Sequence, residues 1–474
     1  MSKKNQNYTN RKQNRFQPER MRGNVFVNNS GKQWLPGENG RAAKVERLLR
    51  GVKEKKKEIA GNMAGYKDSG IEYIGQVPKD WEVLRLKNIS NIYAAKEYLF
   101  GEWPVEKNGK PYSPFGEWSS GNEVIITGRV GTIGQYEMLE KNPKKKILIN
   151  DNRLLIRPFT EDYRKKALSH FLFWAMAIVN LNDIITGSAV PLITATSLLK
   201  KRVVIPPLPE QQRISDFLDT KCGILDRTID AVSRQIEDLE KYKKALITKT
   251  VTKGICKKGE PERVMKDSGV EWIGEDIPFD WDINRLQFCI DEISERNYAG
   301  KETHILSLMK DKGVIPYEEK GRVGNISKTD LTQYKLAYQN TLITNSMNII
   351  IGSSGISQYK GCVSPAYYVF KAKPNNDIRY FNYIFAVRAF QNECRRFANG
   401  ILEIRLRISS TNLLKIKVPV PPLAEQQQIA DYLDEKCKNI DNRVQKRRQQ
   451  LEWLKEYKKS MIFDYVTGKK RVEK

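Results

Sequence analysis

Two blocks of the sequence occur twice, and this duplication constrains the fold more than any other feature. The first block, residues 67–75, returns as residues 266–274 with the pattern Asp-Ser-Gly-(Ile/Val)-Glu-(Tyr/Trp)-Ile-Gly. The second block, residues 206–219, returns as residues 421–434 and contains Pro-Pro-Leu-(Pro/Ala)-Glu-Gln-Gln. Since both blocks keep the same order, the chain consists of two copies of one unit, a pseudo-twofold internal repeat.

The segments between the blocks, residues 82–205 and 282–420, differ in sequence and length. The similarity of the repeated blocks favours a role that both copies share. The difference between the intervening segments favours a separate ligand for each segment. Apolar and alternating stretches at 124–127, 153–157 and 363–370 predict strands. Glycines occur often in both segments, as expected for turns between short elements. The pattern favours two mixed α/β domains, so the predicted fold class is α+β.

Each second block continues into a long amphipathic helix, predicted over residues 208–254 and 421–468. The 215-residue offset holds for more than forty residues without an insertion, as a rigid helix requires. A helix of ~42 residues spans about 60 Å, and alone it would expose its apolar seam. We therefore expect the two helices to pair as an antiparallel coiled coil. Arg447 and Lys458 are expected as polar interruptions of the second seam, and Lys243 stands at the position that matches Lys458. The heptad rhythm of the first helix comprises Leu218, Cys222, Leu225, Ile229, Val232, Ile236, Leu239 and Leu246.

The charge balance indicates the leading partner. The 474 residues include 82 Lys and Arg against 56 Asp and Glu, a formal net charge of +26, and 40% are hydrophobic. That length suggests about three domains, and so large a cationic surplus points to nucleic acid. No apolar run reaches the ~20 residues that a bilayer requires and no secretory signal is seen, so a cytoplasmic location without a membrane partner is expected.

Residues 1–65 are predicted to be a basic N-terminal extension. The first 60 residues contain 16 Lys and Arg against five Glu. Most of the extension is expected to be disordered, whereas residues 41–59 favour a basic helix. Its role is open between a solubilising leader, non-specific phosphate contact and a partner-docking helix.

Catalytic and metal-binding patterns are missing from the sequence. No Gly-Lys pair is followed by Ser or Thr, so the phosphate-binding P-loop is absent. His170 and His304 have no second His or Cys at ligand spacing, and the six cysteines form no CxxC pair. The Asn/Asp-Pro-Pro-aromatic tetrad of amino-methyltransferases is also missing. We therefore expect no catalytic residue, no metal site and no cofactor in this chain.

Taken together, these motifs resemble the DNA-specificity (S) subunits of type I restriction-modification systems. The resemblance covers about residues 66–470 and rests on both repeated blocks, the Gly-Thr-Ile-Gly turn at 131–134 and the segment 359–367. It implies two target-recognition domains, here residues 66–207 and 265–420. Each would bind half of a split DNA site, and the paired antiparallel helices would hold them apart.

The resemblance also implies partners. Two adenine-N6 methyltransferase (modification) subunits are expected to dock on the helices, and ATP-dependent restriction subunits can join through them. S-adenosylmethionine, ATP and Mg would then be bound by the partner subunits. The alternatives are a stand-alone enzyme, a coiled-coil scaffold, and a tandem-domain DNA-binding regulator without methyltransferase partners.

Side chains that match base edges are candidates for DNA contact where they lie on glycine-flexed loops. For any single candidate, stabilising a turn is the alternative role. In the first domain the candidates are Arg129, Asn150, Asn152, Thr186 and Ser188. In the second domain they are Asn345, Asn348, Ser353, Ser354 and Arg405.

The repeated block at the start of each helix is the candidate docking site for the methyltransferase subunits. A ligand common to both halves would explain why the block is alike in both. Helix initiation explains its proline and glutamate, but not its retained pair of glutamines. The candidate docking residues are Leu208, Glu210, Gln211, Gln212, Leu423, Glu425, Gln426 and Gln427.

Overall fold

The computed structural model describes residues 65–94, 124–127, 135–138, 153–160, 165–187, 191–255, 259, 261–274, 276–309, 312–321, 330–398 and 406–473. The chain divides into two compact units, Met1–Asp80 and Trp81–Lys474. The predicted N-terminal extension, residues 1–65 with a helix at 41–59, lies outside the described residues apart from Gly65.

In the first unit the first repeated block forms a β-hairpin. Strands β1 (Tyr66–Asp68) and β2 (Gln76–Pro78) pair antiparallel. In the turn, the Asp68 carboxylate accepts the Gly70 amide at 2.9 Å, and Gly70 has a positive φ of 65°. The Ser69 hydroxyl accepts the Ile71 amide at 3.1 Å. The Asp-Ser-Gly pattern thus supplies two short side-chain acceptors and a residue that tolerates the left-handed region.

The second copy of this block forms the same hairpin within the second unit. Strands β9 (Met265–Asp267) and β10 (Asp276–Pro278) pair in the equivalent register. Asp267 and Ser268 again accept the amides two residues ahead, at 2.9 and 3.1 Å. The two copies therefore fold alike, as the duplication predicts.

Each domain contains a four-stranded antiparallel sheet. The first sheet comprises β4 (Ser90–Ala94), β5 (Val124–Thr127), β6 (Tyr136–Met138) and β7 (Arg153–Pro158). The second comprises β12 (Ile290–Glu292), β16 (Leu342–Asn345), β17 (Ser354–Ile356) and β19 (Tyr367–Ala372). The strand orders are β4-β7-β5-β6 and β12-β19-β16-β17. In both sheets the first strand pairs with the last, so segments that differ in sequence share one topology.

A two-stranded antiparallel sheet joins the two ends of each domain. Strand β3 (Glu82–Arg85) pairs with β8 (Arg202–Ile205), and β11 (Asp282–Arg285) pairs with β20 (Lys417–Val420). The first strand of each pair follows a first repeated block and the second strand precedes a long helix. In the second copy, whose two repeated blocks both lie in the second unit, this pairing brings the blocks close together in space.

Short helices and further strands complete the domains. In the first domain these are α2 (Ser169–Met176) and α3 (Ala195–Leu199), with 3-10 turns η2 (Leu86–Asn88) and η4 (Asn182–Ile184). In the second domain the helices are α5 (Ile378–Ala386), α6 (Arg388–Arg396) and α7 (Ser410–Leu414), with 3-10 turns η5 (Leu286–Phe288), η6 (Tyr317–Lys320) and η7 (Ile349–Ile351). Its additional strand pairs are β13 (Leu306–Met309) with β14 (Gly313–Pro316) and β15 (Lys335–Ala337) with β18 (Gly361–Val363).

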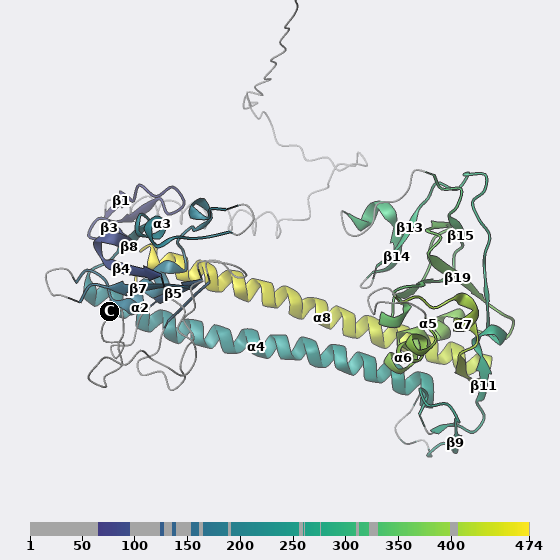
Figure 1. Cartoon of the computed structure of the whole chain (residues 1–474). Helices are drawn as coiled ribbons and strands as arrows, with labels where there is room; N and C mark the ends of the chain where they lie inside the picture. The colour runs from purple at the N-terminus through teal and green to yellow at the C-terminus, as the bar shows by residue number, and fades with distance from the viewer. Residues whose placement is uncertain are drawn as a thin grey trace, which may run out of the picture. The chain divides into compact units, whose positions relative to one another are not determined.

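Two long helices, α4 (Leu208–Lys253) and α8 (Leu423–Val466), lie side by side and form the rod (Figure 1). Their 46 and 44 residues correspond to about 69 and 66 Å. Phe217 near the start of α4 contacts Tyr465 near the end of α8, with ring centroids 4.4 Å apart. The helices are therefore antiparallel, and the predicted fold class is confirmed.

The seam of the rod is apolar, and two lysines interrupt it. Val232, Ile236, Ile440, Val444 and Leu454 are buried in one cluster between the helices. Of the two predicted interruptions, Lys458 forms a cross-helix ion pair with Asp226 at 2.6 Å, and Lys243 at the matching position pairs with Asp441 at 2.6 Å. These pairs are repeat equivalents of each other, so both ends of the rod have the same register. The other predicted interruption, Arg447, is exposed and donates to Gln450 of the same helix.

The two domains pack at opposite ends of the rod. In the first domain, Trp174 of α2 donates to Asp219 near the start of α4. In the second domain, Tyr380 of α5 donates to the carbonyl of Val251, near the end of α4, at 3.1 Å. Val251 and Leu433 of α8 belong to the same buried cluster as the core of the second domain.

Candidate nucleic-acid interface and docking surfaces

Trp281, Glu425 and Arg263 form a polar cluster at the start of α8, which we call the second clamp. The fully buried Trp281 donates its indole N–H to Glu425 Oε2 at 2.8 Å. Both terminal nitrogens of Arg263 donate to the same carboxylate, and its guanidinium lies 5.7 Å from the Trp281 ring centre. Hydrogen bonding to Glu425 raises the pKa of Arg263 above its ordinary value, so this arginine stays charged.

Gly254 ends α4 beside the second clamp. Its φ is 76°, a region that favours glycine. A Cβ atom at this position would lie 2.9 Å from Arg263 and 3.1 Å from Glu425. The glycine that the sequence indicates as a helix stop therefore also leaves room for the ion pair.

The equivalent residues form the first clamp at the start of α4: Trp81, Glu210 and Arg471. Trp81 donates to Glu210 Oε2 at 3.0 Å, and Arg471 Nη1 lies 3.3 Å from Glu210 Oε1. Arg471 follows α8 as Arg263 follows α4. Each long helix thus has in its first turn a glutamate that is bound by an arginine from the segment after the other helix.

The clamps were not predicted from the sequence, although part of the signal was present. The tryptophans and glutamates follow or lie within the repeated blocks, but sequence spacing does not indicate that these residues contact each other. The two arginines stand 208 positions apart instead of 215, so they carry no repeat signal. Their pairing depends on where the chain goes after each helix.

The first glutamine of each retained pair is buried. Gln211 accepts the Leu168 amide at 2.8 Å and donates to the Pro206 carbonyl at 2.7 Å. Gln426 accepts the Asp377 amide at 2.9 Å and donates to the carbonyl five residues before it, also at 2.9 Å. One side-chain amide therefore satisfies a backbone N–H of the domain and a carbonyl before the helix, which explains the retained residue without a partner.

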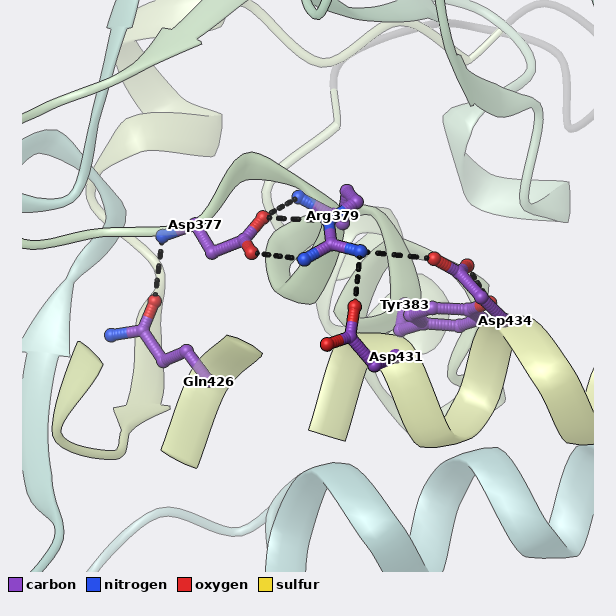
Figure 2. A network of polar contacts seen from close by, with 6 residues as sticks. All are labelled: Asp377, Arg379, Tyr383, Gln426, Asp431 and Asp434. Atoms are coloured by element: carbon purple, nitrogen blue, oxygen red, sulfur yellow. Dashed lines mark hydrogen bonds and ion pairs between the residues drawn. The ribbon is translucent and has the colours of Figure 1, made fainter. Parts of the chain in front are cut away.

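An acidic network fixes α5 of the second domain to the first turns of α8, as Figure 2 shows. Arg379 donates to Asp377 at 2.8 Å and to Asp431 at 2.6 Å, and Tyr383 donates to Asp434 at 2.6 Å. Burial, and then the bond to Asp434, raise the pKa of Tyr383. The phenol therefore stays protonated and keeps donating.

The first domain is attached at the repeat-equivalent aspartate. Asp219, the counterpart of Asp434, accepts the Trp174 indole N–H at 3.0 Å and lies 2.7 Å from His170 Nε2. His170 and Trp174 are four residues apart in α2, as Arg379 and Tyr383 are in α5. Both domains thus attach through the same position of the rod helix with different side chains.

The docking candidates divide into inward-facing and exposed residues. Glu210 and Glu425 bind within the clamps, and Gln211 and Gln426 are fully buried. Leu208 and Leu423 are partly exposed, whereas Gln212 and Gln427 are exposed. A docking role for this block stays a prediction, and its exposed members are Gln212 and Gln427.

Four DNA-contact candidates lie together at the β16–β17 turn, from the last residue of β16 to the first residue of β17. Asn345 is buried and accepts the Met347 amide at 2.9 Å, and the Ser354 hydroxyl donates to Asn382 at 3.1 Å. The amide of the partly exposed Ser353 donates to the Asn348 carbonyl at 3.1 Å. Asn348 is exposed, so it is the member of this group whose side chain best reaches a ligand.

In the first domain, Thr186 lies within the described residues. It is exposed and forms an antiparallel β-bridge with Leu192 at the base of a loop. The remaining candidates lie outside the described residues: Arg129, Asn150, Asn152, Ser188 and Arg405.

A cationic helix face next to the β16–β17 turn was missed. Helix α6 packs against η7, where Gly352 has a φ of 80° and its close neighbour is the buried Gln391 of α6. Arg388 and Arg395 of α6 are exposed. Neither has an ion pair with any residue that the structure describes. A single-sequence pattern could not reveal this face, because its position depends on packing of α6 against the turn.

Within the described part of the chain, no group of three or more His, Cys, Asp or Glu could hold a metal ion. No helix in this part is long and apolar enough to cross a membrane. Burial raises the pKa of the seam thiols Cys222 and Cys437 to about 11, so neither is a reactive thiolate at neutral pH.

The fold and its attachments define an internally duplicated recognition protein, with two similar domains fixed to opposite ends of one helical rod. A family model for the type I restriction modification DNA specificity domain matches residues 78–241 and 285–452. The chain therefore belongs to this family and contains two copies of its domain. It is a DNA-specificity subunit with tandem domains for a bipartite DNA target, and such subunits are non-catalytic.

Individual relatives support this family assignment. The chain is 25% identical over 430 residues to the MjaVIII specificity subunit of a type I restriction enzyme from Methanocaldococcus jannaschii, covering 84% of this chain and 95% of the relative. It is 24% identical over 437 residues to the MjaIX specificity subunit from the same organism, covering 84% and 96%. A solved structure from work on assembly and conformational transition of the type I R-M system shares the fold, with a TM-score of 0.55 and 16% identity, covering 83% of this chain and 99% of that chain.

Proposed function

We propose that this specificity subunit binds one half-site with each domain at a spacing set by the rod. Two methyltransferase subunits dock on the rod, and restriction subunits join through them. S-adenosylmethionine, ATP and Mg bind to those partners. The observation that carries the proposal is the equivalent attachment of both domains to opposite rod ends, through the clamps and through Asp219 and Asp434.

The rod length makes the spacing testable. Seven helical residues rise about 10.5 Å, which is about three base pairs at ~3.4 Å each. Residues 231–237 and 446–452 are repeat equivalents in the middle of the rod. Deleting both heptads keeps the seam in phase, because the apolar pattern repeats every seven residues.

The experiment maps methylated adenines in cells that express the complex with the wild-type chain or with the double deletion. We expect the deletion to shorten the preferred spacer by about three base pairs while both half-sites keep their sequence. A preferred spacer of unchanged length would refute the proposal that the rod sets the spacing of the half-sites. Loss of all methylation despite a folded complex would instead show that the rod positions the enzyme.

Base contacts in the second domain are proposed for Asn348, with phosphate contacts from Arg388 and Arg395 of α6. Phosphate contacts fix position without reading sequence, whereas base contacts discriminate between bases. Asn348→Ala should therefore relax one half-site, and Arg395→Ala should weaken all sites alike. In the first domain, Arg129→Ala is the comparable test and should affect the other half-site by ~1–3 kcal/mol if the arginine is bidentate to guanine.

A further inference from the structure

The rod has large apolar side chains on its surface. Ile224 and Tyr242 of α4 are 47% and 58% exposed, and Trp453 and Tyr457 of α8 are 62% and 48% exposed. The Trp453 and Tyr457 rings stack, with centroids 5.4 Å apart and planes 11° apart. Exposed apolar patches on a polar surface mark sites that another molecule covers.

These four side chains lie on one face of the rod. Ile224 and Tyr242 are 18 residues apart, which is five helical turns, and Trp453 and Tyr457 are one turn apart. Tyr457 is also the repeat equivalent of Tyr242. In an antiparallel helix pair, the twofold axis that exchanges the helices is perpendicular to their common plane. Equivalent residues therefore share a face.

The cross-helix ion pairs fix which residues of the two helices lie across from each other, and the twofold axis of the repeat divides this face into two halves. The Lys458–Asp226 pair sets a register in which Trp453 and Tyr457 lie across from Ala231 and Thr228. The apolar half-face consists of Ile224, Thr228, Ala231, Trp453 and Tyr457. Its repeat equivalents, in the same order, are Asn439, Arg443, Lys446, Asp238 and Tyr242, which form the charged half-face.

The two half-faces differ in chemistry at four of five equivalent positions. Trp453 is replaced by Asp238, and the two small residues of α4 are replaced by Arg443 and Lys446. The charged half-face also contains a groove of about 440 Å³, which Tyr242 and Arg447 help to line. The seam beneath the half-faces also differs at one position, where the buried Val232 has Arg447 as its repeat equivalent.

We propose that the two methyltransferase docking positions are unequal, with the first subunit bound tightly on the apolar half-face and the second bound weakly on the charged half-face. This inference rests on the proposed function, because it takes the occupants to be two copies of one partner. Identical copies present identical surfaces, and one surface cannot match Trp453 and Asp238 equally well.

The order of affinity follows from the side chains. Trp and Tyr supply large, rigid contact areas and are enriched among residues that dominate binding energy. On the charged half-face, Asp238, Arg443 and Lys446 must be desolvated, and any attraction to them is screened by salt. The complex should therefore lose one methyltransferase subunit well before the other, and earlier still at high salt.

The experiment dilutes the purified complex of the full chain with its methyltransferase subunits and follows its composition by native mass spectrometry. We expect the two subunits to dissociate at concentrations at least tenfold apart. The double variant Trp453→Ala/Tyr457→Ala should weaken the tight step roughly 30-fold. Its matched control, Tyr242→Ala on the charged half-face, should leave the tight step unchanged.

A gain-of-function variant keeps the test independent of folding defects. Asp238→Trp places on the charged half-face the residue that Trp453 supplies on the other, and should tighten the weak step. Two equal steps in the wild-type complex, or a tight step that the Trp453→Ala/Tyr457→Ala variant leaves intact, would overturn the inference while the proposed function stands. A complex that never contains a methyltransferase subunit would overturn both.

Discussion

Replacing Glu425 by Gln removes the charge at the centre of the second clamp while keeping the shape of the side chain. The amide oxygen of Gln can still accept the Trp281 indole N–H, which Glu425 accepts at 2.8 Å. The variant therefore removes mainly the bidentate attraction to Arg263. Its effect should appear first where this ion pair holds α8, in the first turns of that helix.

The magnitude follows from the exposure of the pair. Exposed ion pairs contribute about 0.2–1 kcal/mol, and hydrogen bonds to charged groups about 1.5–3 kcal/mol. The Glu425 side chain is 19% exposed and that of Arg263 is 36% exposed, so we expect the loss to be about 1–2 kcal/mol after screening. Glu210→Gln should cost about half as much, because Arg471 approaches Glu210 only to 3.3 Å.

Native-state hydrogen exchange is the appropriate assay, because a chain with several domains need not unfold in one step. A loss of 1–2 kcal/mol corresponds to roughly 5–30-fold faster exchange of amides in the first turns of α8. The control is Glu452→Gln, which removes an exposed contact to Lys455 within α8 and should change exchange by less than about twofold. If Glu425→Gln accelerates exchange no more than this control, the clamp does not hold the start of the helix.

Three further outcomes follow from burial. Leu454→Ala should destabilise the rod by about 2–4 kcal/mol, whereas Trp453→Ala beside it should change thermal stability by less than about 0.5 kcal/mol; similar losses for both would contradict the assignment of Trp453 to the surface. Gln426→Leu should leave the Asp377 amide without its acceptor and cost about 1–3 kcal/mol in denaturant titrations, and a neutral effect would count against the buried bond. Because burial raises the pKa of Cys222 and Cys437 from 9.0 to about 11, alkylation of either thiol at pH 8 should be about 100-fold slower in the folded than in the unfolded chain, measured by peptide mass spectrometry. Equal alkylation rates in the folded and unfolded chains would refute the burial of the thiols. Since the unfolded chain releases these protons at lower pH than the folded chain, the free energy of unfolding should fall as the pH rises from 9 to 11.

The repeated Glu-Gln-Gln block contains both exposed and buried residues, and the sequence does not distinguish between them. The repeat indicated that Gln211 and Gln426 matter, and a common partner was one explanation for that. Both side chains instead bind backbone groups within the chain, so retention across the repeat is explained by attachment of the domains. A repeated residue shows that an environment is repeated, but not whether this environment is internal or belongs to a partner.

The predicted DNA-contact residues of the second domain likewise differ in exposure. The sequence predicts one group of DNA-contact residues, because amide and hydroxyl side chains follow one another near glycines at Asn345, Asn348, Ser353 and Ser354. The structure brings them together at one turn, but Asn345 is buried and Ser354 binds Asn382. Composition indicates which side chains can read a base edge, whereas exposure depends on how α6 packs behind the turn.

The sequence by itself determined the duplication, the two long helices, their antiparallel pairing and the family. Each of these depends on a local period or a repeated motif, and a coiled-coil seam or an Asp-Ser-Gly turn needs no distant residue to be recognised. Only the tertiary structure decided that Trp281 meets Glu425 and Arg263, that both domains share one sheet topology, and that the rod face has unequal halves. Those features depend on residues that are distant in the sequence, such as Trp281 and Glu425, which are 144 positions apart. Such contacts arise from chain geometry and packing, which no local pattern encodes.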